Sequence, residues 1–331
     1  MSKLAPWIQT QLTTLVPRAG HAWLLHGPSG LGQYELGLAL AAAWLCHQPK
    51  TNGACGECAS CHGIVVRAHA DLNVLMPETD MLSHCWPLSE KAQREIDDKK
   101  RKPSKEIRVD AMRDLLGFTQ TTGAGARGKV VLIYPAERMN TVTANTLLKT
   151  LEEPPGNTRF ILASAAAQEI LPTVRSRCQL HPLAWPNNQE GEAWLIQQGV
   201  PEAQTAVLLR AAGGRPADAL QLHRLGISAQ GWRALPKSLV RGEPGVLADH
   251  SPAMVLSSLQ KVCHDMLHLA CGAKPRFFDA NDLPATSPLS ELSQWSRDLM
   301  HIATTVDHPY HAGLLMQAWL SRAQRAMNAR G

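Results

Sequence analysis

The sequence predicts an α/β core followed by an all-helical C-terminal half. In the first half, short apolar runs alternate with stretches of helical periodicity, which is typical of a sheet with crossover helices. After Cys178 this alternation ends, because the segment 181–186 is broken by proline and no convincing strand follows. A chain of 331 residues also exceeds one compact core and is expected to form two or three units. The four predicted strands are Ala22–His26, Leu72–Leu75, Val130–Ile133 and Phe160–Ala163.

Three helices can be placed from apolar spacing and from the residues that end them. Between the last two strands, the i, i+3, i+4, i+7 pattern is followed by Ala144, Leu147, Leu148 and Leu151. Pro154 and Pro155 end that helix, because proline disfavours helical geometry in the residue before it. Two further helical stretches, 201–212 and 216–225, are separated by Gly213-Gly214, a pair that favours a helix end and a turn.

Composition argues against a membrane protein, and the net charge is well below that of a dedicated nucleic-acid binder but decides little by itself. Hydrophobic residues make up 44% of the chain and charged residues 18%, and the net charge is +5. The longest apolar stretch, Leu36–Cys46, is well short of the roughly 18 residues that would span a bilayer. The N-terminus lacks the apolar region of a signal peptide, so the cytoplasm is the expected location. One basic run, Lys99–Lys102, is expected to be a solvated surface loop, because no aromatic residue interleaves with it; a phosphate contact is the alternative.

A phosphate-binding loop is indicated between the first strand and the apolar helix, but its reactive positions are replaced. Gly27 and Gly32 have the glycine spacing of a Walker motif. Gln33 stands where a lysine would neutralise the phosphates, and Tyr34 stands where a small hydroxyl would bind magnesium. Taken alone, the glycines also fit an ordinary turn between a strand and a helix.

The second sequence motif of a nucleotide-binding site, an acidic pair at the end of a strand, is also absent. An apolar strand ending in Asp-Glu is needed there, the aspartate for magnesium and the glutamate for water. The strand 129–133 continues instead into Tyr134 and Pro135. Glu137 lies too far along the chain to replace the acids without a shift in register. Two independent metal-handling positions are therefore missing together.

Three segments resemble a known protein family. They are 145–155 (NTLLKTLEEPP), 159–164 (RFILAS) and Ser176-Arg177-Cys178. Together they closely resemble bacterial clamp-loader subunits of the AAA+ class, and the resemblance covers roughly residues 15–225. The gamma/tau motor subunits of that family keep the lysine and the acidic pair. The departures at Gln33, Tyr34, Tyr134 and Pro135 therefore identify a non-hydrolysing member.

The resemblance implies an architecture and a set of partners. It implies an AAA+-like α/β core with a cysteine module in residues 1–165, a small helical lid in 166–208 and an all-helical collar for oligomerisation in 209–331. The implied partners within the DNA polymerase III holoenzyme are the gamma/tau and delta subunits. The whole complex would load a sliding clamp onto primed DNA. No ATP is expected in this chain's own site, and no intrinsic ATPase activity is expected.

The resemblance also assigns roles to individual residues. The arginine of the Ser-Arg-Cys motif reaches a neighbour's ATP in this family, which makes Arg177 the expected arginine finger in trans; a structural ion-pair role is the alternative. Ser164 matches a nucleotide-sensing position but is expected only to end a strand. In the lid, Pro216 replaces the sensing arginine, and Arg215 lies one place out of register.

Four cysteines predict a structural zinc site. Cys46, Cys55, Cys58 and Cys61 have the spacing C-x₈-C-x₂-C-x₂-C, and four thiolates suit tetrahedral zinc with no open position for catalysis. His47 and His62 are alternative ligands, but each neighbours a cysteine and is expected to be incidental. The same module follows the phosphate loop in the clamp-loader family. Four unliganded thiols are the remaining alternative.

Two other functions remain open from the sequence alone. An active AAA+ motor is favoured by the architecture and opposed by the missing catalytic residues. A zinc-dependent DNA-binding regulatory protein would use the cysteine cluster and the basic loop, and it would bind DNA by itself with a steep salt dependence. The modest charge favours the clamp-loader interpretation over the second alternative.

Overall fold

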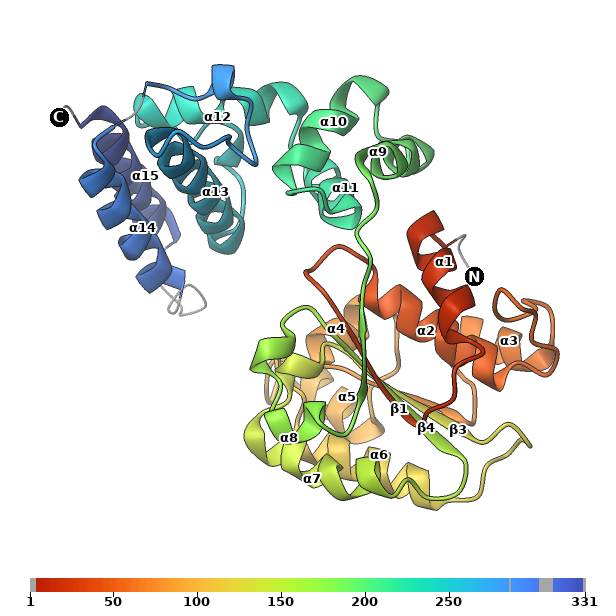
Figure 1. The fold of residues 1–331 in the computed structure, drawn as a ribbon. Helices are drawn as coiled ribbons and strands as arrows, with labels where there is room; N and C mark the ends of the chain where they lie inside the picture. The colour runs from red at the N-terminus through yellow and green to blue at the C-terminus, as the bar shows by residue number, and fades with distance from the viewer. Residues whose placement is uncertain (1–3, 286, 304–311, 330–331) are drawn as a thin grey trace. The chain divides into compact units, whose positions relative to one another are not determined.

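The chain folds into two compact units, which meet at the Trp185-Pro186 bond in the sequence. The structure is a computed structural model that describes residues 4–285, 287–303 and 312–329 (Figure 1). Each unit has its own hydrophobic core. No helix in these described ranges is long and apolar enough to cross a membrane.

The first unit is built on a five-stranded parallel sheet. The strands are β1 (Ala22–His26), β2 (Leu72–Leu75), β3 (Lys129–Ile133), β4 (Thr158–Ser164) and β5 (Gln179–Pro182). Their order across the sheet is β2-β3-β4-β1-β5, and every neighbouring pair is parallel. The sheet therefore has one carboxyl edge, and the loops that follow β1, β3 and β4 all start there.

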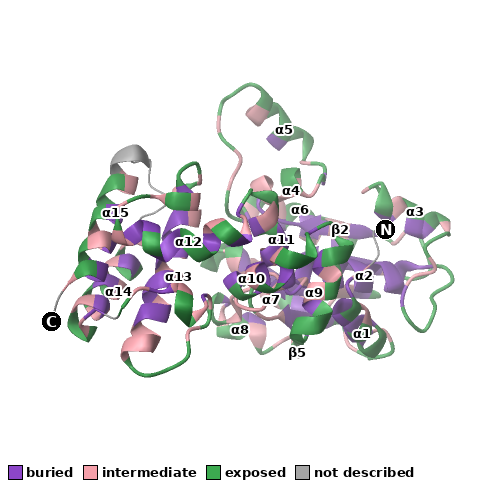
Figure 2. Ribbon diagram, turned by 90° about the horizontal axis from the view of Figure 1, so that it is seen from above, coloured by how far each residue is buried: buried purple, intermediate pink, exposed green. Residues whose placement is uncertain are grey.

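Helices cover both faces of this sheet (Figure 1). One face carries α1 (Pro6–Leu15), α2 (Gln33–Leu45) and α3 (Ala59–Val65), and the other carries α6 (Val109–Gln120) and α7 (Thr141–Glu152). Shorter helices are α4 (Glu78–Ser83), α5 (Glu90–Asp97), α8 (Pro172–Arg175), η1 (Ala136–Arg138) and η2 (Ala167–Glu169). α2 is buried almost all round because it is apolar on every side, whereas α5 projects with mostly exposed residues (Figure 2).

The second unit is helical throughout its described residues. α9 (Asn188–Gln197), α10 (Glu202–Ala211) and α11 (Pro216–Arg224) pack on one another. α12 (Ala229–Val240), α13 (Pro252–Ala270), α14 (Leu289–Ala303) and α15 (Ala312–Asn328) follow, with short turns η3 (Gly245–Leu247) and η4 (Ala280–Asp282) between them. Fully buried Trp232, Phe278 and Trp295 are among the largest side chains of this core.

The predicted elements are confirmed, and one strand was missed. The four predicted strands correspond to β1–β4, and the predicted helices correspond to α7, α10 and α11. β5 was missed because it is an edge strand with a proline and only one residue that is not exposed, so it lacks the apolar pattern of a strand. Because β5 pairs with β1, the sheet continues past residue 165, and the boundary expected at residue 208 falls inside α10. The division of the helical part into lid and collar stays a prediction.

The basic run Lys99–Lys102 is a surface loop with internal ion pairs. Arg101 forms a two-pronged ion pair with Glu78 and a third contact with Glu95 at 2.7 Å. Lys100 pairs with Asp98 at 2.9 Å. The guanidinium thus fastens the loop to α4 and α5.

Candidate functional site

The phosphate loop predicted from the sequence lies at the carboxyl end of β1 and leads into α2. Gly30 and Gly32 both have left-handed backbone, with φ of 77° and 95°. Leu31 between them is fully buried, and its carbonyl accepts a hydrogen bond from Trp7 Nε1 at 2.9 Å. Helix α1 therefore packs directly against the loop.

Gln33 fills the loop with its own side chain. Its Nε2 donates to the carbonyl oxygens of Gly27 at 2.6 Å and Pro28 at 2.7 Å, and the residue is only 4% exposed. Both N–H groups of the amide therefore donate to carbonyl groups of the loop itself. A phosphate would therefore meet a neutral, hydrogen-bonded amide at the position where a Walker lysine brings a positive charge.

Tyr34, at the motif position where a small hydroxyl would bind magnesium, belongs to an aromatic cluster. Its ring centroid lies 4.3 Å from that of His84 and 5.5 Å from that of Tyr134. Its hydroxyl accepts a hydrogen bond from Trp86 Nε1 at 2.7 Å, and the Arg67 guanidinium lies 4.6 Å above the Trp86 ring. We call Tyr34, His84, Trp86 and Tyr134 the aromatic plug.

Burial keeps the plug electrically neutral. It raises the pKa of Tyr34 and lowers the pKa of His84, in each case because the charged form would lose water. The phenol therefore stays protonated and the imidazole unprotonated near neutral pH. The plug offers neither an anionic ligand for magnesium nor a positive charge for phosphate.

The acidic positions after β3 are occupied as the sequence indicated. Tyr134 belongs to the aromatic plug, and Pro135 leads into η1. Glu137 is turned to the end of β4, where its Oε1 accepts a hydrogen bond from Ala165 N at 3.0 Å. Ser164, fully buried, uses its Oγ to accept from Ala166 N at 3.0 Å, as a strand-end residue does.

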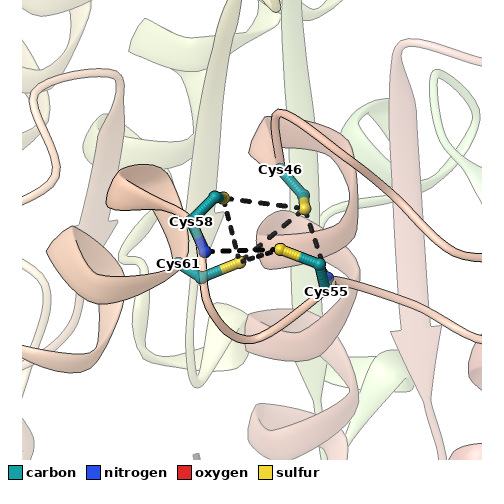
Figure 3. A group of neighbouring side chains, drawn as sticks. All are labelled: Cys46, Cys55, Cys58 and Cys61. Atoms are coloured by element: carbon teal, nitrogen blue, oxygen red, sulfur yellow. Dashed lines mark hydrogen bonds between the residues drawn. The ribbon is translucent and has the colours of Figure 1, made fainter.

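The four cysteines predicted as ligands converge on one point (Figure 3). Their sulfur atoms all lie within 4.8 Å of one another. Four of the separations are Cys46–Cys58 3.9 Å, Cys55–Cys61 3.8 Å, Cys58–Cys61 3.5 Å and Cys46–Cys61 3.7 Å. Four sulfurs bonded to one zinc ion at about 2.3 Å in a tetrahedron are about 3.8 Å apart. The sulfurs therefore fit a tetrahedral zinc ion and are too far apart for disulfides.

The local chain course and the acidity of the thiols also suit a metal. Backbone N–H groups of Cys55 and Cys58 point at the sulfurs of Cys46 and Cys55, at 3.2 and 3.4 Å. Backbone N–H groups lower the pKa of Cys58 to about 6, whereas burial raises the pKa of Cys61 to about 12. A cation would therefore meet one thiol that ionises readily and another that needs the cation to ionise. The neighbouring residues His47 and His62 are exposed, and the four-ligand group within the described chain consists of cysteines only.

Arg177 lies on the surface of the first unit, just after α8. Its Nη1 donates to Thr173 O at 2.8 Å, and its Nη2 forms an ion pair with Glu152. In the second unit, Arg215 pairs with Asp218 at 3.0 Å at the start of α11, and Pro216 is the first residue of that helix. Both arginines therefore have partners within their own unit.

Sequence reasoning missed three residues of this region. His84 and Trp86 lie in a segment without a motif, and nothing in the sequence places them beside Tyr34. Glu152 belongs to the segment that carries the family resemblance, but no role was assigned to it. An acidic residue at the last position of a helix is unusual, and that signal could have singled it out.

Comparison with known proteins places the chain in a family. A family profile described as "DNA polymerase III, delta subunit" matches residues 8–186, which is more than half of the chain. The chain belongs to the DNA polymerase III delta subunit family. Its membership agrees with the clamp-loader resemblance of the segments around Glu152 and Arg177.

Individual relatives of this family carry the delta-prime name. The chain is 39% identical to a DNA polymerase III subunit delta-prime of Pseudomonas aeruginosa over 70% of its length, and 34% identical to that of Escherichia coli over 69%. The matched stretches span 64% and 62% of those two relatives' own length. A gamma/tau subunit of Mycobacterium bovis is 30% identical over 62% of the chain. A solved gamma-subunit-related protein of Thermotoga maritima aligns over 97% of the chain, with a TM-score of 0.46 and 14% identity.

Proposed function

We propose that the chain is the non-hydrolysing delta-prime subunit of a DNA polymerase III clamp loader. In this role it assembles with gamma/tau and delta subunits in the cytoplasm and helps to load the sliding clamp onto primer–template DNA. The observation that carries the proposal is the self-filled nucleotide site. Gln33 occupies the phosphate loop, and the aromatic plug occupies the magnesium position.

Chemistry argues against hydrolysis in this site. Phosphoryl transfer depends on cations that neutralise the phosphates and on groups that orient the attacking water. Gln33 and Tyr34 supply no cation and no metal ligand, and the acidic positions after β3 are Tyr134 and Pro135. Without a nucleotide of its own, the subunit has no ligand that would shift it between conformations. It would serve as a fixed neighbour for the motor subunits.

Arg177 is proposed as an arginine finger that acts on a neighbouring subunit's ATP. Its support is the Ser-Arg-Cys motif, the family membership and a side chain that is 29% exposed. A guanidinium fixed beside a γ-phosphate stabilises the charge that develops in the transition state, and such fingers contribute about 10³ to 10⁵ in rate in GTPases.

A structural zinc ion is proposed for the cysteine cluster. Cys46, Cys55, Cys58 and Cys61 would hold it, and the ion would cross-link the end of α2 to the start of α3. All four ligands come from the protein, so the site has no coordination position for substrate.

Two measurements test the proposed function. The purified chain alone should show no measurable ATP hydrolysis and at most weak ATP binding. When combined with gamma/tau and delta subunits, it should co-purify with them and be required for clamp loading. Turnover of ATP by the chain free of partners, abolished by a change at Gln33 or Tyr34, would contradict the proposal.

A further inference from the structure

Arg177 is held by two contacts that come from different elements. Its Nη2 pairs with Glu152, the last residue of α7, and its Nη1 donates to the carbonyl of Thr173 in α8 at 2.8 Å. We propose that Glu152 is the positioning residue of the arginine finger, which fixes the plane of the Arg177 guanidinium before a neighbour's ATP arrives. The inference rests on the finger role given to Arg177 under the proposed function.

The backbone around Arg177 is fixed independently of its side chain. Arg177 N donates to Val174 O at 3.2 Å, and Val174 is fully buried in the core of the first unit. Cys178 packs against the same core, and burial raises the pKa of its thiol to about 12. The backbone on either side of Arg177 is therefore held by the core. The long side chain of Arg177 is not fixed by these contacts, so its orientation depends on a partner of its own.

The two contacts leave donors for a phosphate. A guanidinium has five N–H groups, and the contacts to Thr173 and Glu152 use one on each terminal nitrogen. Nε is covered and has no hydrogen-bond partner among the described residues. The N–H groups that remain on the two terminal nitrogens are thus available to an incoming phosphate oxygen. Glu152 can therefore stay in place while the finger works.

Stability alone does not account for a carboxylate at this position. Glu152 ends a helix, where the negative end of the helix dipole disfavours an acidic side chain. Its side chain is 51% exposed and that of Arg177 29%, and an ion pair so exposed to water contributes little to folding. A residue that breaks a local rule in this way is expected to serve a site.

The inference is tested by a double-mutant cycle in the complex reconstituted with gamma/tau and delta subunits. The measured quantities are kcat and KM for DNA-stimulated ATP hydrolysis by complexes that contain Arg177→Ala, Glu152→Ala or both. We expect Glu152→Ala to lower kcat by about 3- to 10-fold with KM unchanged, because a misplaced group loses rate without losing substrate binding. The double variant should match Arg177→Ala, because Glu152 acts only through the arginine.

Further variants separate positioning from folding and assembly. Glu153→Ala removes the neighbouring exposed carboxylate and should leave kcat unchanged, whereas Glu152→Gln keeps a hydrogen-bond acceptor and should retain more activity than Glu152→Ala. Thermal midpoint and co-purification should be the same for all of these variants. If Arg177→Ala lowers kcat but Glu152→Ala has no effect, or the two effects simply multiply, the positioning role is overturned and the finger stands. If Arg177→Ala itself leaves kcat unchanged, the finger role fails and the positioning role with it.

Discussion

Tyr34, which stands at a ligand position of the Walker motif, is part of the core of the first unit. A small hydroxyl at this position would face a metal ion, whereas the phenol is 6% exposed and packs between His84 and Tyr134. Its hydroxyl is the acceptor for the Trp86 indole. The side chain that replaces the small hydroxyl of the motif therefore has a structural role.

This structural role predicts a measurable loss for a small change. Tyr34→Phe keeps the ring and removes only the hydroxyl, so the buried Trp86 N–H loses its acceptor. The free energy of unfolding should fall by about 1–3 kcal/mol. Denaturant titration of the single variants Tyr34→Phe and Trp86→Phe and of the double variant measures the coupling. A double variant that loses the full sum of the two single effects would contradict the hydrogen bond as the cause.

The sequence predicted which residues of the nucleotide-binding motifs are absent, but it did not predict the contacts that their replacements make. The losses at Gln33, Tyr34, Tyr134 and Pro135 were visible as departures from a motif. The contacts that fill the site are long-range, since Trp86 lies 52 residues from Tyr34. Local periodicity carries no information about such pairs, and the spacing of the cysteine cluster was readable only because its ligands are close in sequence.

At the scale of elements, α1 and α2 together shape the phosphate loop. Gly32 precedes α2 with φ of 95°, and a Cβ built on it would lie 2.2 Å from Ile8 Cδ1 of α1. The left-handed backbone favours a glycine at this position, and a methyl group there would also require the end of the Ile8 side chain to move.

Substitution of Gly32 distinguishes the cost of the backbone conformation from the cost of the contact with Ile8. Backbone strain alone should make Gly32→Ala lower the free energy of unfolding of the first unit by about 1–3 kcal/mol. The loss should be larger than that, because the methyl group also displaces the end of the Ile8 side chain. Gly156→Ala is the matched control, since Gly156 also has positive φ, at 57°, but has open space around its Cβ position. Thermal unfolding of both variants, and of Gly32→Ala combined with Ile8→Ala, provides the comparison. Equal losses for Gly32→Ala and Gly156→Ala would argue against the packing of α1 on the loop.

At the scale of the whole molecule, two cores imply two folding units. The core of the first unit and the core of the second are formed from separate stretches of the chain, which divide after Trp185. The change of pattern after Cys178 predicted an all-helical second half, whereas the domain boundaries expected at residues 165 and 208 do not coincide with this division. The extent of the sheet was harder to predict, because β5 is held by pairing with β1 and not by an apolar pattern of its own.

Metal removal should affect only one of these units. Calorimetry of the zinc-loaded chain should show two unfolding transitions, since separate domains depart from two-state behaviour. A chelator should lower the midpoint of the first unit's transition, because the cysteine cluster lies there, and leave the other unchanged. Hydrogen exchange of residues 33–65 assigns the transitions. Zinc content below about half an equivalent after mild purification, or equal shifts of both midpoints, would contradict a structural zinc ion in the cluster.

The ion pairs of Arg101 and Lys100 reduce the positive charge that the loop Lys99–Lys102 presents to other molecules. Two carboxylates, Glu78 and Glu95, already neutralise its guanidinium, and Asp98 neutralises Lys100. Two of the four cationic side chains in the run Lys99–Lys102 are thus paired with carboxylates, which weakens the long-range attraction of this loop for a polyanion. The attraction that this loop can exert on a nucleic acid at low ionic strength therefore rests on its two other lysines, Lys99 and Lys102.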